Sequence, residues 1–361
     1  MNFIKWVIGR ISYSLVVILG VVSLIFFLFN ILPGDPARMM LGQRADLNTV
    51  ETITKELGLD KPLYMQYIRY LNDLSPISVY QEYNTNSYFY LDQKKYIHAK
   101  RIFRTANGTT LVLKMPWLGK SFQSQMSVGK IIGEAFPNTL VLALTSILIA
   151  FILGNLFGIF AAIRRDTWYD RFTLLFSTIG MSLPSFFAAI LIAWFFAYKL
   201  GNITHLNITG NLFEVDNLGE GIHLKLKNLI LPAITLGIRP LSVVIQLSRN
   251  SMLEVLNQDY IRTAYAKGLN FRRVIFIHAF RNSLNPVVTA VSGWFASMLA
   301  GVVFVEYIFG WKGLGYLLVN ALNQYDLPVL LGCVLTTSVL FVLVNISMDI
   351  IYAILDPRIR K

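Results

Sequence analysis

Residues 257–268 read NQDYIRTAYAKG, a polar run inside an otherwise very hydrophobic chain. Residues 271–282 follow as FRRVIFIHAFRN, and long apolar segments flank the two runs. In the first run Ile261, Ala264, Tyr265 and Leu269 recur at helical spacing, and Gly268 is expected to end the helix. This pattern predicts a short amphipathic helix that a partner protein could grip.

The second run has its own apolar face, formed by residues at positions i, i+3, i+4, i+7 and i+8: Phe271, Val274, Ile275, His278 and Ala279. Arg272 and Arg273 then point elsewhere, towards water or lipid headgroups. The alternative interpretation of both runs is an ordinary amphipathic loop at the membrane surface.

The composition indicates a membrane protein. Hydrophobic residues make up 55% and charged residues 14%, with a mean hydropathy of +0.55, whereas about a quarter of an average soluble chain is charged. The net charge of +12 gathers in short segments between apolar runs, as the positive-inside rule expects, which argues against nucleic-acid binding. Cys333 is the one cysteine, so the sequence has neither a disulfide framework nor a cysteine metal motif.

Six segments are long and apolar enough to span a bilayer, which needs about 20 such residues. They are residues 11–32, 137–163, 172–198, 229–247, 286–305 and 328–352. The third contains Leu183-Pro184 and is expected to be one kinked span. Two short helices broken at Pro184 are the alternative, which would give seven crossings.

The Lys and Arg residues of the short loops set the orientation. One side collects Lys5, Arg10, Arg164, Arg165, Arg171, Arg249, Arg262, Lys267, Arg272, Arg273, Arg281, Arg358, Arg360 and Lys361. The shorter loops of the other side hold only Lys199, Lys225, Lys227 and Lys312. Both termini are therefore expected in the cytoplasm, with residues 33–136 outside and the first span kept as an uncleaved anchor.

The outward segment 33–136 is expected to have two parts. Residues 36–75 are predicted to be helical, with amphipathic stretches at 49–57 and 63–74. Residues 76–116 are rich in Tyr, Asn and Lys, and two β-prone runs, 101–106 and 109–114, flank Asn107-Gly108. An Asn-Gly pair between such runs predicts a hairpin, so the insertion 76–116 is expected to contain β-structure and to act as a spacer or docking surface.

Several motifs together resemble the oligopeptide/dipeptide/nickel permease family of type I ABC importers, most closely the first permease of a peptide importer. The resemblance covers most of the chain and is carried by residues 256–269, 278–282 with Pro286, 32–37, 56–62, 117–121, 182–186, 306–309 with 313–315, and 356–360. Arg262-Thr263-Ala264 replaces the generic Glu-Ala-Ala triplet, as is normal for the peptide subgroup. Tyr265, Arg239-Pro240 and the insertion 76–116 depart from the pattern.

The resemblance implies an all-α polytopic membrane protein with the six transmembrane helices of the type I fold and an extracytoplasmic α/β insertion between helices 1 and 2. Its parts would be 1–32, the outward segment 33–136, and a permease core 137–361 with a cytoplasmic coupling loop at 249–285. The implied partners are a second homologous permease, two ABC ATPases and an extracytoplasmic substrate-binding protein. The coupling helix would comprise Asp259, Tyr260, Ile261, Arg262, Thr263, Ala264, Tyr265, Lys267 and Gly268.

In this interpretation the chain is a transport subunit of a bacterial inner membrane, without cofactor or metal, and its partners hydrolyse ATP because it has no P-loop motif. Peptide is the expected substrate, with nickel or another small solute as the nearest alternative. An ion-coupled secondary transporter is the alternative from another class, but acidic residues at membrane depth are scarce. Arg239 could line the pathway, or its side chain could extend to the membrane interface.

Overall fold

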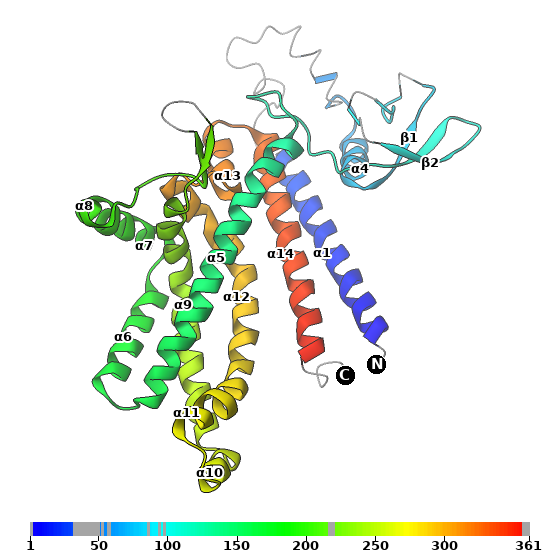
Figure 1. Ribbon diagram of the computed structural model, residues 1–361. Coiled ribbons are helices and arrows are strands. Elements are labelled where there is room, and N and C mark those ends of the chain that lie inside the picture. Colours follow the sequence, from blue (N-terminus) through cyan, green and yellow to red (C-terminus); the bar gives the residue numbers. More distant parts are fainter. Residues whose placement is uncertain are drawn as a thin grey trace. The chain divides into compact units, whose positions relative to one another are not determined.

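The computed structural model describes residues 3–31, 51, 54–55, 59–84, 87–92, 95–96, 99–215 and 221–355. Its helices are α1 (Phe3–Ile31), α4 (Leu63–Leu74), α5 (Val128–Ile163), α6 (Trp168–Ser182), α7 (Ser185–Ile192), α8 (Gly201–Thr204), α9 (Lys227–Leu256), α10 (Asp259–Ala266), α11 (Phe271–Arg273), α12 (Phe280–Phe309), α13 (Leu314–Asn323) and α14 (Leu327–Leu355). Two π-helical segments are η1 (Ala193–Lys199) and η2 (Val274–Ala279). The strands are β1 (Ile77–Gln81), β2 (Lys100–Arg104), β3 (Thr109–Leu113), β4 (Phe213–Val215) and β5 (Ile222–Leu224), and Figure 1 shows these elements.

Four helical segments within the described residues are long and apolar enough to cross a membrane: Ile8–Leu28, Val128–Ile163, Lys227–Leu256 and Leu327–Ile350. Two bent helix pairs raise the number to 6 if each pair counts as one span. The first pair is Trp168–Ser182 with Ser185–Lys199, and the second is Val302–Phe309 with Leu314–Asn323. The expected fifth span, 286–305, lies on α12, and the other expected spans lie on α1, α5, α6 to η1, α9 and α14.

The expected third span is not a gently kinked helix. α6 and the segment from α7 to η1 meet at an angle of 113°. Leu183 at the break has extended backbone angles (φ −73°, ψ 127°), as the residue before a proline prefers. Pro184 also lacks the N–H that would continue the helical hydrogen bonds. The alternative of two helices broken at Pro184 therefore describes this segment better than one kinked span.

The chain divides into two compact units, and one of them comprises residues 12–134 and 317–338. Its amphipathic helix α4 spans Leu63–Leu74, where the sequence predicts a helix, whereas the stretch expected at 49–57 lies mostly outside the described residues. β2 and β3 form the predicted antiparallel hairpin, and β1 pairs with the other edge of β3. Gly108 in the connection has φ +78°, a conformation that glycine adopts without strain.

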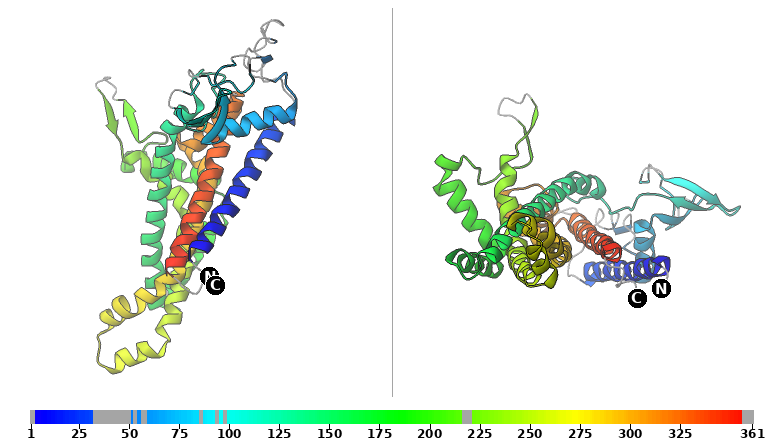
Figure 2. Two further views of the ribbon diagram at one scale, coloured as in Figure 1. Left: turned by 90° about the vertical axis from the view of Figure 1, so that its right-hand side faces the viewer. Right: turned by 60° about the horizontal axis from the view of Figure 1, so that its bottom comes forward.

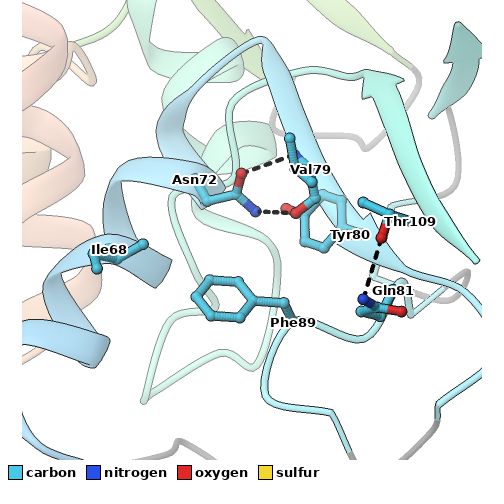
Figure 3. A pocket seen from close by; sticks show the side chains of 7 residues that line it. All are labelled: Ile68, Asn72, Val79, Tyr80, Gln81, Phe89 and Thr109. Atoms are coloured by element: carbon cyan, nitrogen blue, oxygen red, sulfur yellow. Dashed lines mark hydrogen bonds between the residues drawn. The ribbon is translucent and has the colours of Figure 1, made fainter. Parts of the chain in front are cut away.

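An open hollow of about 280 Å³ lies between α4 and the sheet of this unit (Figure 3). The amide of Asn72 donates to Val79 O and accepts from Val79 N, both at 3.0 Å. Gln81 Nε2 donates to Thr109 Oγ1 at 3.3 Å. These bonds tie helix α4 to strand β1 and strand β1 to strand β3.

A buried charged cluster stabilises the other face of the same sheet. Asp73 accepts from Lys95 Nζ at 2.8 Å and from the hydroxyls of Tyr80 and Tyr96. Lys114 donates to the carbonyl oxygens of Asp73 and Ser75, and its Nζ lies 5.0 Å from the centre of the Tyr96 ring. Burial lowers the pKa of Lys114 to about 8, because removal from water disfavours the charged ammonium.

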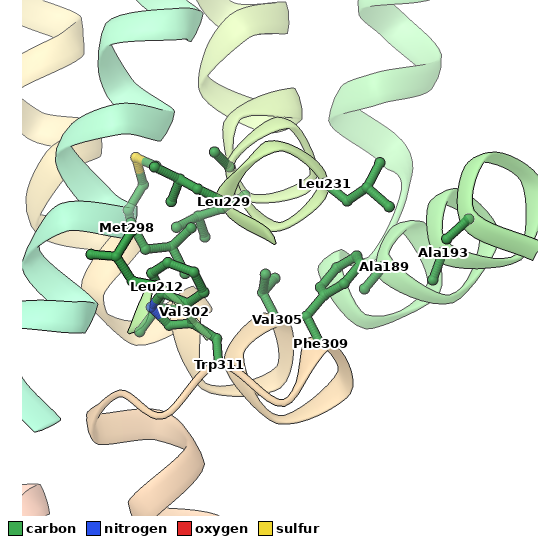
Figure 4. Packing of buried hydrophobic residues seen from close by; sticks show 14 residues of the cluster. Ala189, Ala193, Leu212, Leu229, Leu231, Met298, Val302, Val305, Phe309 and Trp311 are labelled. Atoms are coloured by element: carbon green, nitrogen blue, oxygen red, sulfur yellow. The ribbon is translucent and has the colours of Figure 1, made fainter. Parts of the chain in front are cut away.

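The other unit comprises residues 1–11, 135–316 and 339–361 and contains a helical bundle with two apolar clusters. The larger cluster joins α5, α7, η1, α9 and α12 (Figure 4). Its labelled members are Ala189, Ala193, Leu212, Leu229, Leu231, Met298, Val302, Val305, Phe309 and Trp311. Gly154 and Gly158 let α5 approach α9 closely, since a Cβ at Gly158 would lie 2.6 Å from Ile245 O.

Candidate functional site

The second apolar cluster of this unit holds helix α10 against the bundle. Ile261 and Ala264 of α10 are 1% and 7% exposed. They pack with Ile159 and Ala162 of α5 and Met252 of α9. Figure 1 shows α10 and α11 at the end of this bundle, and the left view of Figure 2 shows the same yellow segment projecting there. Ile261 and Ala264 of the predicted apolar face therefore anchor α10 to its own chain, whereas Tyr265, which was expected on the same face, is exposed.

Gly268 ends this helix, as predicted, through a left-handed turn with φ +76°. Gly268 N donates to Tyr265 O at 2.9 Å and Leu269 N donates to Ala264 O at 3.3 Å. These two bonds are those of a Schellman motif, which satisfies carbonyl groups at a helix end. The motif sends the chain back towards the bundle, where Leu269 packs against the same cluster as Ala264.

Asn270 is the N-cap of the next helical segment, α11. This role was not predicted from the sequence. Its Oδ1 accepts from Arg273 N at 2.9 Å, which is the N-cap bond favoured by Asn, Ser, Asp and Thr. The signal was present as an Asn directly before a predicted helix. Val274, Ile275 and Ala279 of the predicted second apolar face are buried, at 0%, 1% and 0% exposure. Phe271 of the same predicted face is 53% exposed and His278 is half-buried, so only part of that face packs inward.

The remaining candidate residues form the outer face of α10. Tyr260 and Tyr265 are 41% and 43% exposed, and Asp259, Arg262, Thr263, Lys267 and Gly268 are exposed as well. Arg262 lies 3.5 Å from Asp259, and Asn282 Nδ2 donates to Tyr260 Oη at 2.8 Å. The structure thus divides the nine candidates into two anchors, Ile261 and Ala264, and seven residues on the surface.

Arg239 is separate from this surface. It lies within α9, is exposed, and makes no hydrogen bond or ion pair within the described part of the chain.

Two charged features of the same unit escaped the sequence analysis. Asp170 of α6 and Arg249 of α9 form a buried ion pair at 2.5 Å, and the sequence shows Arg249 only as one of the positive charges on the expected cytoplasmic side. Glu306 of α12 is 0% exposed, and its Oε2 accepts from Gly315 N at 2.7 Å and Tyr316 N at 3.2 Å. No periodicity marks either feature, because the partners lie far along the chain or belong to the main chain.

Several long apolar helices define a multi-pass membrane protein. Residues 154–361 match the family described as binding-protein-dependent transport system inner membrane component, and residues 3–88 match its N-terminal membrane component. The chain belongs to this family of ABC importer permeases, in its peptide branch. The predicted family is thereby confirmed.

Three relatives are named for the transport of peptides or glutathione. The di/tripeptide transport system permease protein DppB of Pseudomonas aeruginosa (strain UCBPP-PA14) is 33% identical over 372 residues, with 99% of both chains covered. A putative peptide transport system permease protein of Brucella abortus (strain 2308) is 36% identical over 355 residues, with 98% of both covered. The glutathione transport system permease protein GsiC of Salmonella paratyphi A (strain ATCC 9150 / SARB42) is 31% identical over 357 residues, with 99% of both covered.

Proposed function

We propose that this permease forms half of a translocation pathway for peptides and that α10 is the helix through which a cytoplasmic ATPase moves it. The observation that carries the proposal is the division of α10 into a buried anchor and an exposed face. Ile261 and Ala264 fix the helix to α5 and α9, while Tyr260, Arg262 and Tyr265 remain available to a partner. A force applied to the outer face would therefore reach the bundle.

The substrate class follows from the relatives. The relatives are named for di/tripeptides, peptides and glutathione, and the chain matches each of them along nearly its whole length. We therefore assign peptides to this permease in preference to nickel or another small solute.

The rest of the assembly completes the proposal. A second homologous permease would supply the other half of the pathway, two ABC ATPases would drive it, and an extracytoplasmic binding protein would deliver the peptide. With α6 and the segment from α7 to η1 counted as one broken span, the chain would cross the membrane six times, with both termini in the cytoplasm. The parts would be 1–32, an outward segment 33–136 with its β-containing insertion 76–116, and the core 137–361 with the coupling loop 249–285.

Site-directed cross-linking tests the role of α10. The native Cys333 is buried, so a cysteine placed on the surface will react selectively. Arg262→Cys, at a position whose side chain is 75% exposed, should cross-link to a P-loop ATPase in native membranes, as mass spectrometry would show. Arg165→Cys is the matched control, since it replaces another exposed arginine of the same predicted cytoplasmic side (61%).

Cross-linking to an ATPase from position 262 but not from 165 would support the proposal. A chain that purifies alone and yields no such product would refute it. Uptake of a labelled tripeptide into liposomes that contain the complex should require ATP. Uptake driven by an ion gradient without ATP would instead indicate a secondary transporter.

A further inference from the structure

A buried ion pair links helices α6 and α9 close to the coupling segment. Arg249 Nε donates to Asp170 Oδ1 at 2.5 Å and an Arg249 terminal nitrogen donates to Oδ2 at 2.7 Å. The side chains of Arg249 and Asp170 are only 15% and 2% exposed. Two parallel bonds between a planar guanidinium and a carboxylate fix both orientation and distance, so this contact holds the two helices in one arrangement.

Asp170 is itself held by the turn before α6. Asp166 N donates to Asp170 Oδ2 at 3.0 Å, and Asp166 adopts a left-handed conformation with φ +63°. The carboxylate thus joins three elements: the turn that follows α5, the first turn of α6, and the last part of α9. Its position is set by the fold and does not depend on flexible surface side chains.

The pair lies where motion of α10 would enter the bundle. α9 runs without interruption to Leu256, and α10 begins at Asp259. Arg249 therefore lies about two turns before the end of the helix that carries α10. Further along the same interface, Gln246 Nε2 donates to Ser177 Oγ at 2.7 Å, and a Cβ at Gly180 would lie 2.3 Å from Ser242 Oγ.

We propose that Asp170 and Arg249 are positioning residues that make α6 follow α9 when the ATPase moves α10. Beyond the bend at Pro184, α7 and η1 join α9 in the larger apolar cluster through Ala189, Ala193 and Ala197. The α6–η1 segment is thus attached to α9 at both ends, by the ion pair at one and by apolar packing at the other. The inference rests on the proposed function, because it assigns the path by which motion of α10 spreads.

The test measures tripeptide taken up per ATP hydrolysed by the whole reconstituted transporter. Asp170→Asn and Arg249→Met each remove the link, while the side-chain oxygen of the introduced asparagine can still accept from Asp166 N. Each variant should lower the ratio roughly tenfold, which corresponds to about 1.4 kcal/mol of lost coupling. The double variant should show the same tenfold loss, since its second change removes a link that is already broken.

The double variant also separates positioning from folding. Each single variant leaves a lone buried group, whereas the double variant leaves no unpaired charge. The double variant should therefore be extracted from membranes in an amount closer to that of the wild type. Its ratio of tripeptide uptake to ATP hydrolysis should nevertheless stay low. Asp166→Asn is the matched control, because its side chain is 78% exposed and Asn tolerates its left-handed backbone. Its ratio should equal that of the wild type.

Three results would overturn the inference. The first is an unchanged ratio of tripeptide uptake to ATP hydrolysis in both single variants, whatever their yield. The others are losses of this ratio that multiply in the double variant, or an equal loss in Asp166→Asn. A wild-type complex that imports no peptide with ATP would instead refute the proposed function. The two failures are therefore distinguishable.

Discussion

Replacement of Gly268 by alanine should loosen the C-terminal end of α10 without a steric clash. Gly268 has φ +76°, and a Cβ built there meets nothing within 4 Å. The cost is therefore confined to the backbone, where a non-glycine residue in the left-handed region costs about 1–2 kcal/mol. That energy corresponds to a factor of roughly 5–30 in the population of the intact turn.

Hydrogen–deuterium exchange measures this population directly. The amides of residues 268 and 269 donate the two bonds of the Schellman motif, so their exchange should accelerate by roughly 5–30-fold in Gly268→Ala, in line with the same energy. Gly268→Asn should show a smaller effect, because asparagine tolerates the left-handed conformation better than alanine.

Gly133→Ala is the matched control. Gly133 also has open space around a built Cβ, but it lies inside helix α5 and has no positive φ. Alanine there should leave exchange at residues 268 and 269 unchanged and should slightly favour its own helix. Wild-type exchange in Gly268→Ala would refute the reasoning, since it would mean that the turn does not depend on the left-handed conformation.

Three further predictions concern packing, capping and pH. Gly158→Ala would place a Cβ 2.6 Å from Ile245 O, so thermal unfolding in detergent should show a loss of about 1–3 kcal/mol, and an unchanged midpoint would contradict it. Asn270→Ala removes the cap of α11 and should cost about 1 kcal/mol, seen as faster exchange at residues 271–275, whereas Asn270→Asp should retain the protection. Burial lowers the pKa of Lys114 to about 8, against 10.5 in its unperturbed state. Above pH 8 the unfolded chain therefore binds more protons than the folded chain, and the free energy of unfolding rises with pH. Protection of the β3 amides from exchange should accordingly rise from about pH 8 to 9.5. Lys114→Met should reduce that rise and leave the part that comes from Lys95, whose pKa burial also lowers; an undiminished rise would assign it to another group.

Local patterns predicted much of the fold. α4 at Leu63–Leu74, the hairpin of β2 and β3, and the break at Gly268 depend on residues near one another in sequence. Hydrophobic periodicity and glycine conformation are sufficient for such features. The same patterns identified the apolar faces of residues 257–268 and 271–282 in part, since Ile261, Ala264, Val274 and Ile275 are buried while Tyr265 and Phe271 are exposed.

The sequence did not show what those faces contact. Ile261 and Ala264 were expected to touch an ATPase, but they pack against α5 and α9. A periodic pattern reveals that one face is apolar, yet it does not distinguish a partner's surface from the chain's own. The 113° bend at Pro184 has a similar cause, since a proline permits either a kink or a break and tertiary packing decides between them.

The buried carboxylate of Glu306 determines which neighbouring positions should tolerate substitution. Its hydrogen-bond donors are the main-chain N–H groups of Gly315 and Tyr316, which most substitutions leave in place. A mutational scan would therefore find Glu306 sensitive and Tyr316 tolerant of every exchange but proline, which alone deletes the donor. Gly313 and Gly315 would be intolerant for a different reason, because a Cβ would lie 2.2 Å from Glu306 Oε1 or 2.4 Å from Val303 Cα. Methods that infer contacts from correlated substitutions would miss the hydrogen bonds to this carboxylate, because their donors are main-chain N–H groups and not side chains.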